Sequence, residues 1–245
     1  MSPSGRRVAV VTGGSGGIGS EVCRRLGSDG FAVVVGFAGR REEADTTAKA
    51  VNEAGGEGIA IQVDVAEESQ VVSLFDQAEA DLGGVDVVVH LAGIMPLATL
   101  ADLDLRSFDQ IIRINLRGTF VVNQQAAKRL RAGGAIINFT SSVVKLAFPG
   151  FSAYAASKGG VEALTMILAR ELRGRDITVN AIGPGPTATP LMLNAESDDR
   201  KEELTHMSPL ERLGHPTDIS EVVAFLAGPA RWVNGQVLYV NGGII

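Results

Sequence analysis

Short runs of β-branched residues alternate with longer stretches of mixed polar and apolar residues along this chain. The apolar runs predict strands over 7–12, 32–36, 58–63, 86–90, 135–140, 178–182 and 236–240. Several of them, such as VAVV and the VVV that follows Asp86, are apolar at consecutive positions, which is typical of strands buried on both faces of a parallel sheet. Between the strands, the pattern predicts helices over 18–29, 41–54, 67–82, 103–131, 152–173 and 217–227.

The helix predicted over 67–82 shows the amphipathic period clearly. Its apolar positions, with a spacing near 3.6 residues, are Val71, Leu74, Phe75, Ala78 and Leu82. Alternating strands and helices indicate right-handed βαβ crossovers in an open sheet, so we expect a single doubly wound α/β domain of Rossmann type over 1–245. The region 183–216 is proline-rich and irregular, and we expect it to cover a site.

Composition and charge exclude several classes of protein. The 245 residues are 45% hydrophobic and 20% charged, as in ordinary globular proteins, which excludes disorder as the main state. A net charge of −6 argues against nucleic-acid binding, and one cysteine excludes an intrachain disulfide and a cysteine-based zinc cluster. No apolar stretch approaches the ~18 residues of a spanning helix, and none resembles a secretory signal. We therefore expect a cytoplasmic protein without a membrane partner.

A glycine-rich segment, TGGSGGIG over 12–19, joins the first predicted strand to the first predicted helix. Such a turn lets backbone N–H groups approach a pyrophosphate, and the helix N-terminus adds partial positive charge. A tight turn without a ligand is the alternative interpretation. The candidate cofactor contacts in this segment are Gly13, Ser15, Gly17, Ile18 and Gly19.

The end of the second strand bears on which dinucleotide would bind. NAD-binding units place an acidic residue there to bind the ribose 2′-hydroxyl, but this chain has Phe37, followed by Arg40 and Arg41. A guanidinium can pair with a 2′-phosphate, so we favour NADP(H) over NAD(H). Alternatively, both arginines are solvated residues at the start of a helix. The helix dipole disfavours cations at that end, which adds weight to the ligand interpretation.

Tyr154 and Lys158 lie four residues apart at the start of a predicted helix and therefore share one face. An ammonium beside a phenol favours the phenolate and lowers the tyrosine pKa, which suits acid–base chemistry at a carbonyl or carbinol. Ser141 follows a predicted strand, where its hydroxyl can bind the substrate oxygen. Ser142 is adjacent, and from position alone either serine could serve.

TGGSGGIG, Asn115 within INLRG, Ser141, Tyr154 with Lys158, and Pro184-Gly185 occur in this order. The ordered set resembles the short-chain dehydrogenase/reductase family, in particular its 3-oxoacyl-(acyl-carrier-protein) reductase-like and glucose-dehydrogenase-like members. The likeness extends over essentially the whole chain. It implies a seven-stranded parallel sheet of order 3-2-1-4-5-6-7 and a homotetramer.

The resemblance also implies a catalytic set. Tyr154 matches the proton donor to the carbonyl oxygen, and Lys158 matches the residue that lowers the tyrosine pKa and holds the nicotinamide ribose. Ser141 rather than Ser142 aligns with the hydroxyl that binds the substrate oxygen, and Asn115 aligns with the residue that anchors a relay water.

Further cofactor contacts come from the same resemblance. Asp64 and Val65 match the adenine contacts, and Arg40 falls where NADP-preferring relatives bind the 2′-phosphate. Ala92 and Gly93 match the small residues that lie beside the cofactor ribose. The segment that packs on the nicotinamide is matched by Pro184, Gly185, Thr187 and Thr189. The family usually has two asparagines where this chain has His90 and Leu91, and we expect His90 to be a core histidine.

The function implied is NADP(H)-dependent interconversion of a carbonyl and a secondary alcohol, with a 3-oxoacyl thioester or another ketone as substrate. The loop 187–208 would cover that substrate. An apolar pocket for the substrate would be lined by Met95, Phe148, Phe151, Met192 and Met207. Alternatively, these side chains only pack in the core. No residues show metal-ligand spacing. Other possibilities are an NAD-linked alcohol or sugar dehydrogenase, a dinucleotide-sensing protein without turnover, and a sugar-nucleotide isomerase.

Overall fold

The strands form one parallel seven-stranded sheet of order β3-β2-β1-β4-β5-β6-β7, as expected. The computed structural model describes residues 5–195 and 197–245. The strands are β1 (Val8–Thr12), β2 (Ala32–Phe37), β3 (Glu57–Gln62), β4 (Val87–His90), β5 (Ala135–Phe139), β6 (Thr178–Pro184) and β7 (Val237–Val240). The reversal of order between β1 and β4 places a crevice outside the carboxyl ends of these two strands.

Both faces of the sheet are buried, which explains the continuous apolar runs in the sequence. In β1, Val8 and Val10 belong to one core cluster, whereas Ala9 and Val11 belong to the other. Successive side chains of a strand point to opposite faces, so these four residues of β1 contribute alternately to the two cores.

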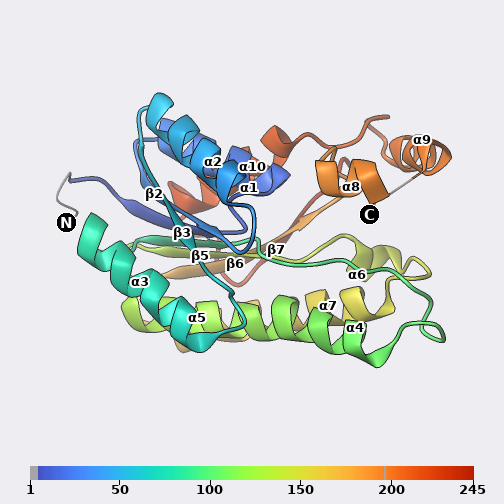
Figure 1. Ribbon diagram of the computed structural model, residues 1–245, viewed down its shortest axis with the longest axis horizontal. Helices are drawn as coiled ribbons and strands as arrows, with labels where there is room; N and C mark the ends of the chain where they lie inside the picture. Colours follow the sequence, from blue (N-terminus) through green and yellow to red (C-terminus); the bar gives the residue numbers. More distant parts are fainter. Residues whose placement is uncertain (1–4, 196) are drawn as a thin grey trace.

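Helices cover the two faces of the sheet as separate layers (Figure 1). On one face lie α1 (Gly17–Ser28), α2 (Arg41–Glu53) and α10 (Pro216–Ala227), which contribute to the same core cluster. On the other face lie α3 (Glu68–Leu82), α4 (Leu105–Ile111), α5 (Gly118–Arg129) and α7 (Ser152–Glu171). No helix in the described part of the chain is both long and apolar enough to cross a membrane.

The helix predicted over 103–131 contains a π-helical segment that the sequence pattern did not reveal. The chain runs from α4 through η1 (Ile112–Arg117), where the hydrogen bonds are π-type, directly into α5. Asn115 lies within η1 and is fully buried. Single π turns inside α-helices occur frequently at functional sites, and this one places Asn115 beside the crevice.

The region 183–216 is more regular than expected. It contains α8 (Pro190–Ala195) and α9 (Asp198–Met207), and residue 196 of the expected cover 187–208 lies outside the described residues. The Ser197 hydroxyl accepts a hydrogen bond from the Arg200 N–H at the start of α9, a helix-capping contact. The prediction of an irregular loop was wrong because this cap was not recognised. A further short helix, α6 (Val143–Leu146), was also not predicted.

We expect the stability of the fold to depend on the α3 side of the core. Leu74 is completely buried, so Leu74→Ala should lower the free energy of unfolding by about 3 kcal/mol through lost burial and an unfilled cavity. The matched variant Leu100→Ala removes the same atoms from a side chain that is 79% exposed and should change stability by less than about 0.5 kcal/mol. Urea unfolding measures both. Equal losses would contradict this placement of the core.

Candidate active site

A cavity of about 700 Å³ opens at the carboxyl ends of the central strands, between the glycine-rich turn and helices α8 and α9. In open α/β sheets this crevice is where ligands bind. The structure brings most of the sequence-predicted site residues to its wall: Gly13, Gly17, Ile18, Gly19, Arg40, Ala92, Gly93, Ser141, Tyr154, Lys158, Pro184, Gly185, Thr187 and Thr189.

The other predicted residues do not line the cavity. Phe37 is buried in the core, and Val65 packs against Gly118. The Asp64 carboxylate pairs with Arg113 at 3.0 Å. The residues absent from the wall are Ser15, Phe37, Asp64, Val65 and Asn115. For the first four, contact with a cofactor stays a prediction.

The glycine-rich turn forms a cradle that side chains would fill. Gly13 has a φ of +73°, and a Cβ there would lie 2.9 Å from the Ala92 nitrogen. A Cβ on Gly19 would lie only 2.2 Å from the Gly13 carbonyl oxygen. The N-terminus of α1 has no side-chain cap and no acidic residue in its first turn. Its backbone N–H groups therefore suit an anion such as a pyrophosphate, and the residues present fit a dinucleotide.

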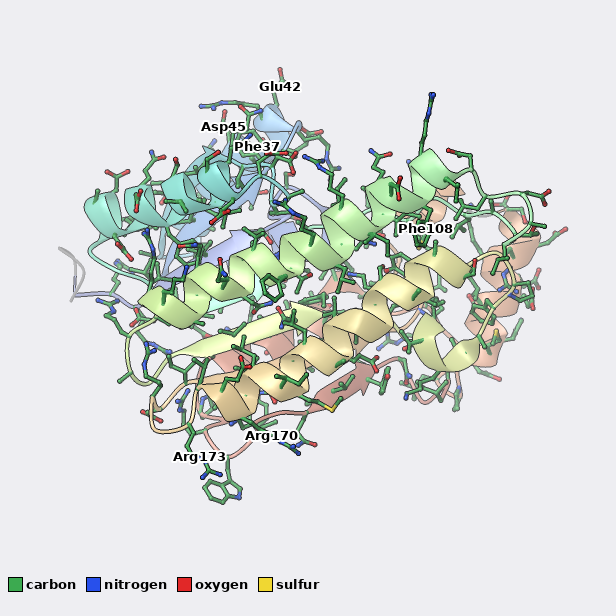
Figure 2. All side chains as sticks on the ribbon, turned by 90° about the horizontal axis from the view of Figure 1, so that it is seen from below. Phe37, Glu42, Asp45, Phe108, Arg170 and Arg173 are labelled. Carbon is green, nitrogen blue, oxygen red and sulfur yellow. The ribbon has the colours of Figure 1, made fainter. Side chains whose placement is uncertain are left out.

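The two arginines after β2 have different surroundings. Arg41 lies over the Phe37 ring at 5.7 Å and pairs with Asp45 at 3.5 Å. Figure 2 shows Phe37 and Asp45 close together where α2 begins. Arg40 instead lines the cavity, and its Nη2 lies 3.6 Å from where a Cβ on Gly16 would be. Of the two, Arg40 is therefore placed to meet a phosphate bound at the glycine-rich turn.

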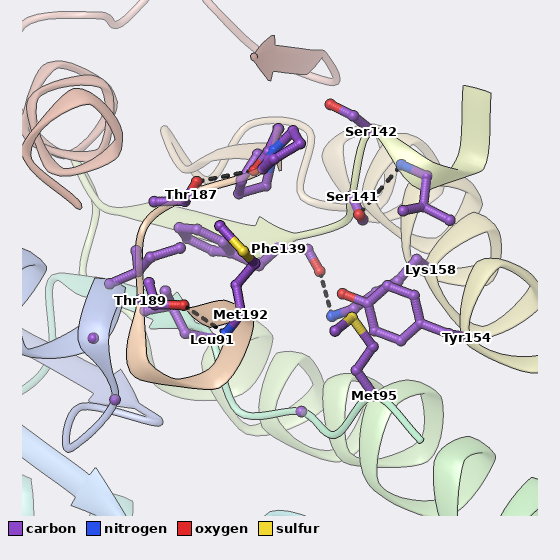
Figure 3. A pocket seen from close by; sticks show the side chains of 18 of the residues that line it. Leu91, Met95, Phe139, Ser141, Ser142, Tyr154, Lys158, Thr187, Thr189 and Met192 are labelled. Atoms are coloured by element: carbon purple, nitrogen blue, oxygen red, sulfur yellow. Dashed lines mark hydrogen bonds between the residues drawn. The ribbon is translucent and has the colours of Figure 1, made fainter. Parts of the chain in front are cut away.

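The Lys158 side chain is buried and tied to the strand beside it. Its ammonium donates a hydrogen bond to the Phe139 carbonyl oxygen at 2.8 Å, and the Thr140 hydroxyl donates to the Lys158 carbonyl oxygen at 3.2 Å. Burial lowers the pKa of Lys158 to about 8, so the ammonium remains charged at neutral pH. Figure 3 shows the Lys158 and Tyr154 side chains directed into the same part of the cavity.

Asn115 joins three elements behind the cavity. Its Oδ1 accepts the Ile94 N–H at 2.9 Å, and its Nδ2 donates to the Ile94 carbonyl oxygen at 2.9 Å and to the Ser157 hydroxyl at 3.2 Å. A Cβ on Gly93 would lie 3.2 Å from Asn115 Oδ1 and 3.6 Å from the Lys158 ammonium. The loop after β4, η1 and α7 are thus held together just behind the Lys158 side chain.

The Tyr154 phenol is less acidic than the sequence suggested. Burial raises its pKa to about 12, and only a hydrogen bond with Ser141 acts in the opposite direction. Burial therefore outweighs any lowering by Lys158 in this geometry, and the expectation that Lys158 lowers the Tyr154 pKa stays a prediction. The ammonium lies 5.8 Å from the Tyr154 ring centroid and is bound to a carbonyl, so burial of the phenol dominates.

The adjacent serines have separate roles in the structure. The Ser142 hydroxyl is buried and donates to the Gly183 carbonyl oxygen at 3.2 Å. The Ser141 hydroxyl lies beside Tyr154 and accepts the Val143 N–H at 3.3 Å. Position after a strand could not separate these two serines, whereas the hydrogen bonds show that Ser142 is committed to the neighbouring strand β6.

His90 lies in the core, as we expected for this departure from the family pattern. Its Nδ1 is 2.8 Å from the Thr12 hydroxyl, whereas its Nε2 has no hydrogen-bond partner among the described residues. Burial, assisted by the nearby Lys158 charge, lowers the pKa of His90 to about 3, so the ring is neutral. The histidine therefore connects the ends of β1 and β4 without adding a charge.

Several residues of the cavity were not found from the sequence. The Phe139 carbonyl is the Lys158 partner, and a backbone group carries no sequence signal. Leu146, Arg200 and Leu204 also line the wall, and the charged patch around Arg200 was the signal available. Of the candidate apolar pocket, the residues on the wall are Met95, Phe148, Phe151 and Met192, whereas Met207 is absent from it.

Sequence comparison identifies clear relatives. The family described as enoyl-(acyl carrier protein) reductase matches residues 13–245. A short-chain type dehydrogenase/reductase of Picea abies is 42% identical, covering 98% of this chain and 92% of the relative. An NADPH-dependent aldehyde reductase-like protein of Arabidopsis thaliana is 38% identical, covering 99% and 96%. A 3-oxoacyl-(acyl-carrier-protein) reductase of Staphylococcus epidermidis is 39% identical, covering 96% and 98%.

Solved structures give the same result. A dehydrogenase/reductase from Sinorhizobium meliloti superposes with a TM-score of 0.93 at 35% identity, covering 97% of this chain and 94% of the other. A blue fluorescent protein from a metagenomic library, solved with NADPH, superposes with a TM-score of 0.91 at 38% identity, covering 97% of each chain. Together with the sheet order, these similarities establish that the chain is an oxidoreductase of the short-chain dehydrogenase/reductase family.

Proposed function

We propose that this enzyme uses NADP(H) to interconvert a ketone or aldehyde and the corresponding alcohol. One observation carries the proposal: Ser141, Tyr154 and Lys158 line the same cavity as the glycine-rich turn and Arg40. A dinucleotide on the turn and a carbonyl beside the tyrosine would therefore share one space. That arrangement is what hydride transfer between a cofactor and a substrate requires.

The cofactor would be held mainly by backbone groups and by Arg40. The turn from Gly13 to Gly19 and the uncapped N-terminus of α1 suit the pyrophosphate, and Arg40 suits a 2′-phosphate at the same end of the cavity. Similar proteins that are named NADPH-dependent or were solved with NADPH support the same choice. The bound nicotinamide supplies or accepts the hydride.

The protein side chains would bind the substrate oxygen and donate a proton to it. Ser141 and Tyr154 both present a hydroxyl to the cavity, so a carbonyl oxygen placed between them receives two hydrogen bonds. Because the pKa of Tyr154 is about 12, the phenol is protonated at neutral pH and can donate its proton to the oxygen during reduction. The Lys158 ammonium, charged at neutral pH, would stabilise the phenolate that remains.

The names of similar proteins indicate a class of substrate, the carbonyl compounds. Among the similar proteins, one is named an aldehyde reductase-like protein and another a 3-oxoacyl-(acyl-carrier-protein) reductase, which supports carbonyl reduction with a 3-oxoacyl thioester or another ketone. The presence of both Tyr154 and Lys158 favours turnover over dinucleotide sensing. Residues 187–208 as a cover for the substrate, a homotetrameric assembly and a cytoplasmic location stay predictions.

Replacing Tyr154 tests the proposed function directly. In Tyr154→Phe, kcat for ketone reduction should fall by about 10³-fold because the proton donor is lost, while the Kd for NADPH should change by less than about twofold. Loss of NADPH absorbance measures turnover on an acetoacetyl thioester, a β-keto ester, a quinone and an aryl ketone. Turnover that persists at the wild-type rate would rule out Tyr154 as the proton donor.

The two adjacent serines should respond differently to the same substitution. Ser141→Ala should lower kcat/KM by roughly 10²-fold because one hydrogen bond to the developing oxyanion is lost. Ser142→Ala should keep kcat/KM within about threefold but lower the free energy of unfolding by about 1 kcal/mol, since its bond to Gly183 is lost. Steady-state kinetics and urea unfolding of both variants measure these effects, and the reverse pattern would exchange the two roles.

The adjacent arginines provide a matched test of cofactor preference. Arg40→Ala should reduce the ratio of kcat/KM for NADPH over NADH by about tenfold or more, because a charge-assisted contact with the 2′-phosphate is removed. Arg41→Ala removes the same charge one residue away, where the side chain is engaged with Phe37 and Asp45, and should leave the ratio within about twofold. An unchanged ratio in Arg40→Ala would exclude this residue from the phosphate site.

A further inference from the structure

Aromatic rings form a connected series that leads from the reacting groups to a cation on α9. The Tyr154 and Phe151 ring centroids are 6.4 Å apart in an edge-on arrangement, and those of Phe151 and Phe148 are 6.0 Å apart. The Arg200 guanidinium carbon lies 4.8 Å from the Phe148 ring centroid. All four side chains line the cavity, so one of its walls is aromatic near the tyrosine and positively charged farther out.

Arg200 is the cation of this cavity that the proposed chemistry leaves unassigned. The charged side chains of the described wall are Arg40, Lys158 and Arg200, and no aspartate or glutamate of the described chain lines it. Arg40 lies beside the glycine-rich turn, and the Lys158 ammonium is bound to the Phe139 carbonyl. A cavity with charge of one sign and apolar walls attracts ligands of the opposite sign.

Two contacts hold the Arg200 guanidinium, one with a carboxylate and one with an aromatic ring. One nitrogen, Nη1, pairs at 2.6 Å with Glu203, whose side chain is 60% exposed and does not line the cavity. The planar group also rests on Phe148, which limits its rotation. A guanidinium has five N–H donors, so a held Arg200 can still bind a carboxylate presented from within the cavity.

We propose that Arg200 makes the enzyme prefer carbonyl substrates that carry a carboxylate or a similar anionic group on an aromatic or other apolar body. The proposal rests on the proposed function, because it places the carbonyl at Ser141 and Tyr154. The apolar body then lies along Phe151 and Phe148, and the anion meets Arg200. Because Phe151 and Phe148 lie between Tyr154 and Arg200 in this series of contacts, we expect the anion at the end of the apolar body away from the carbonyl.

Matched substrates of nearly the same shape but different charge test this preference. We would measure kcat/KM with NADPH for aryl methyl ketones that carry a para carboxylate or a para carboxamide, in one-ring and biphenyl versions. The wild-type enzyme should prefer the carboxylate by about tenfold at the better-fitting length, and added salt should reduce that preference. Equal values for the two members of both pairs would overturn the proposal.

Variants on α9 distinguish an effect of the Arg200 charge from a general effect of changing this helix. Arg200→Met should abolish the preference mainly by lowering kcat/KM for the carboxylate, and Arg200→Lys should retain part of it. Lys201→Met is the matched control, because Lys201 pairs with Asp198 at 2.9 Å and does not line the cavity, so the preference should remain. A preference that survives in Arg200→Met, or an equal loss for both substrates, would overturn the proposal.

Two readouts keep this test separate from that of the proposed function. The neutral carboxamide has no anion for Arg200. If its turnover is lost in Tyr154→Phe, that loss therefore tests carbonyl reduction and not the charge preference. If none of these ketones is reduced, the Kd values of the carboxylate and carboxamide for the NADPH-loaded enzyme still measure the charge preference. Tighter binding of the carboxylate that disappears in Arg200→Met would support the role of Arg200, and equal Kd values in the wild-type enzyme would contradict it.

Discussion

The hydrogen bond from the buried Lys158 ammonium to the Phe139 carbonyl is the contact on which the geometry of the site depends. It fixes α7 against the carboxyl end of β5, so that Tyr154, one turn earlier on α7, and Ser141, just after β5, face one cavity. Burying a cation is unfavourable, and the lowered pKa of Lys158 reflects this cost. Asn115, from the π-helical segment, supports the same arrangement by joining the loop after β4 to α7.

The two ends of the cavity are built from different kinds of groups. At the glycine-rich turn the protein contributes mainly backbone, because even a Cβ on Gly13 or Gly19 would collide with neighbouring main chain. At the other end it contributes rings and the Arg200 guanidinium. A backbone cradle suits the shared phosphates of a dinucleotide, whereas side chains that vary freely can select among substrates.

Most of the fold could be predicted from the sequence, because strands buried on both faces leave continuous apolar runs and α3 leaves a regular amphipathic period. The π-helical turn at Asn115 lies inside a longer helical pattern, and α6 and α8 are too short to show a helical period, so none of them was predicted. The helix α9 was missed because its Ser197 cap was not recognised. Sequence spacing correctly brought Tyr154, Lys158 and Ser141 together at one cavity. It could not predict that burial raises the Tyr154 pKa, because burial is a property of the folded surroundings.

Because the glycine-rich turn and the Ser141 and Tyr154 side chains line one cavity, we expect direct hydride transfer from a bound cofactor to a carbonyl carbon. The most direct test is to incubate the enzyme with a ketone substrate and NADPH that carries deuterium at the transferable position of the nicotinamide. Mass spectrometry of the alcohol should find the deuterium on the carbinol carbon, and Tyr154→Phe should form this labelled alcohol about 10³-fold more slowly. NADPH that binds tightly while no label reaches any carbonyl compound would rule out direct hydride transfer by this enzyme.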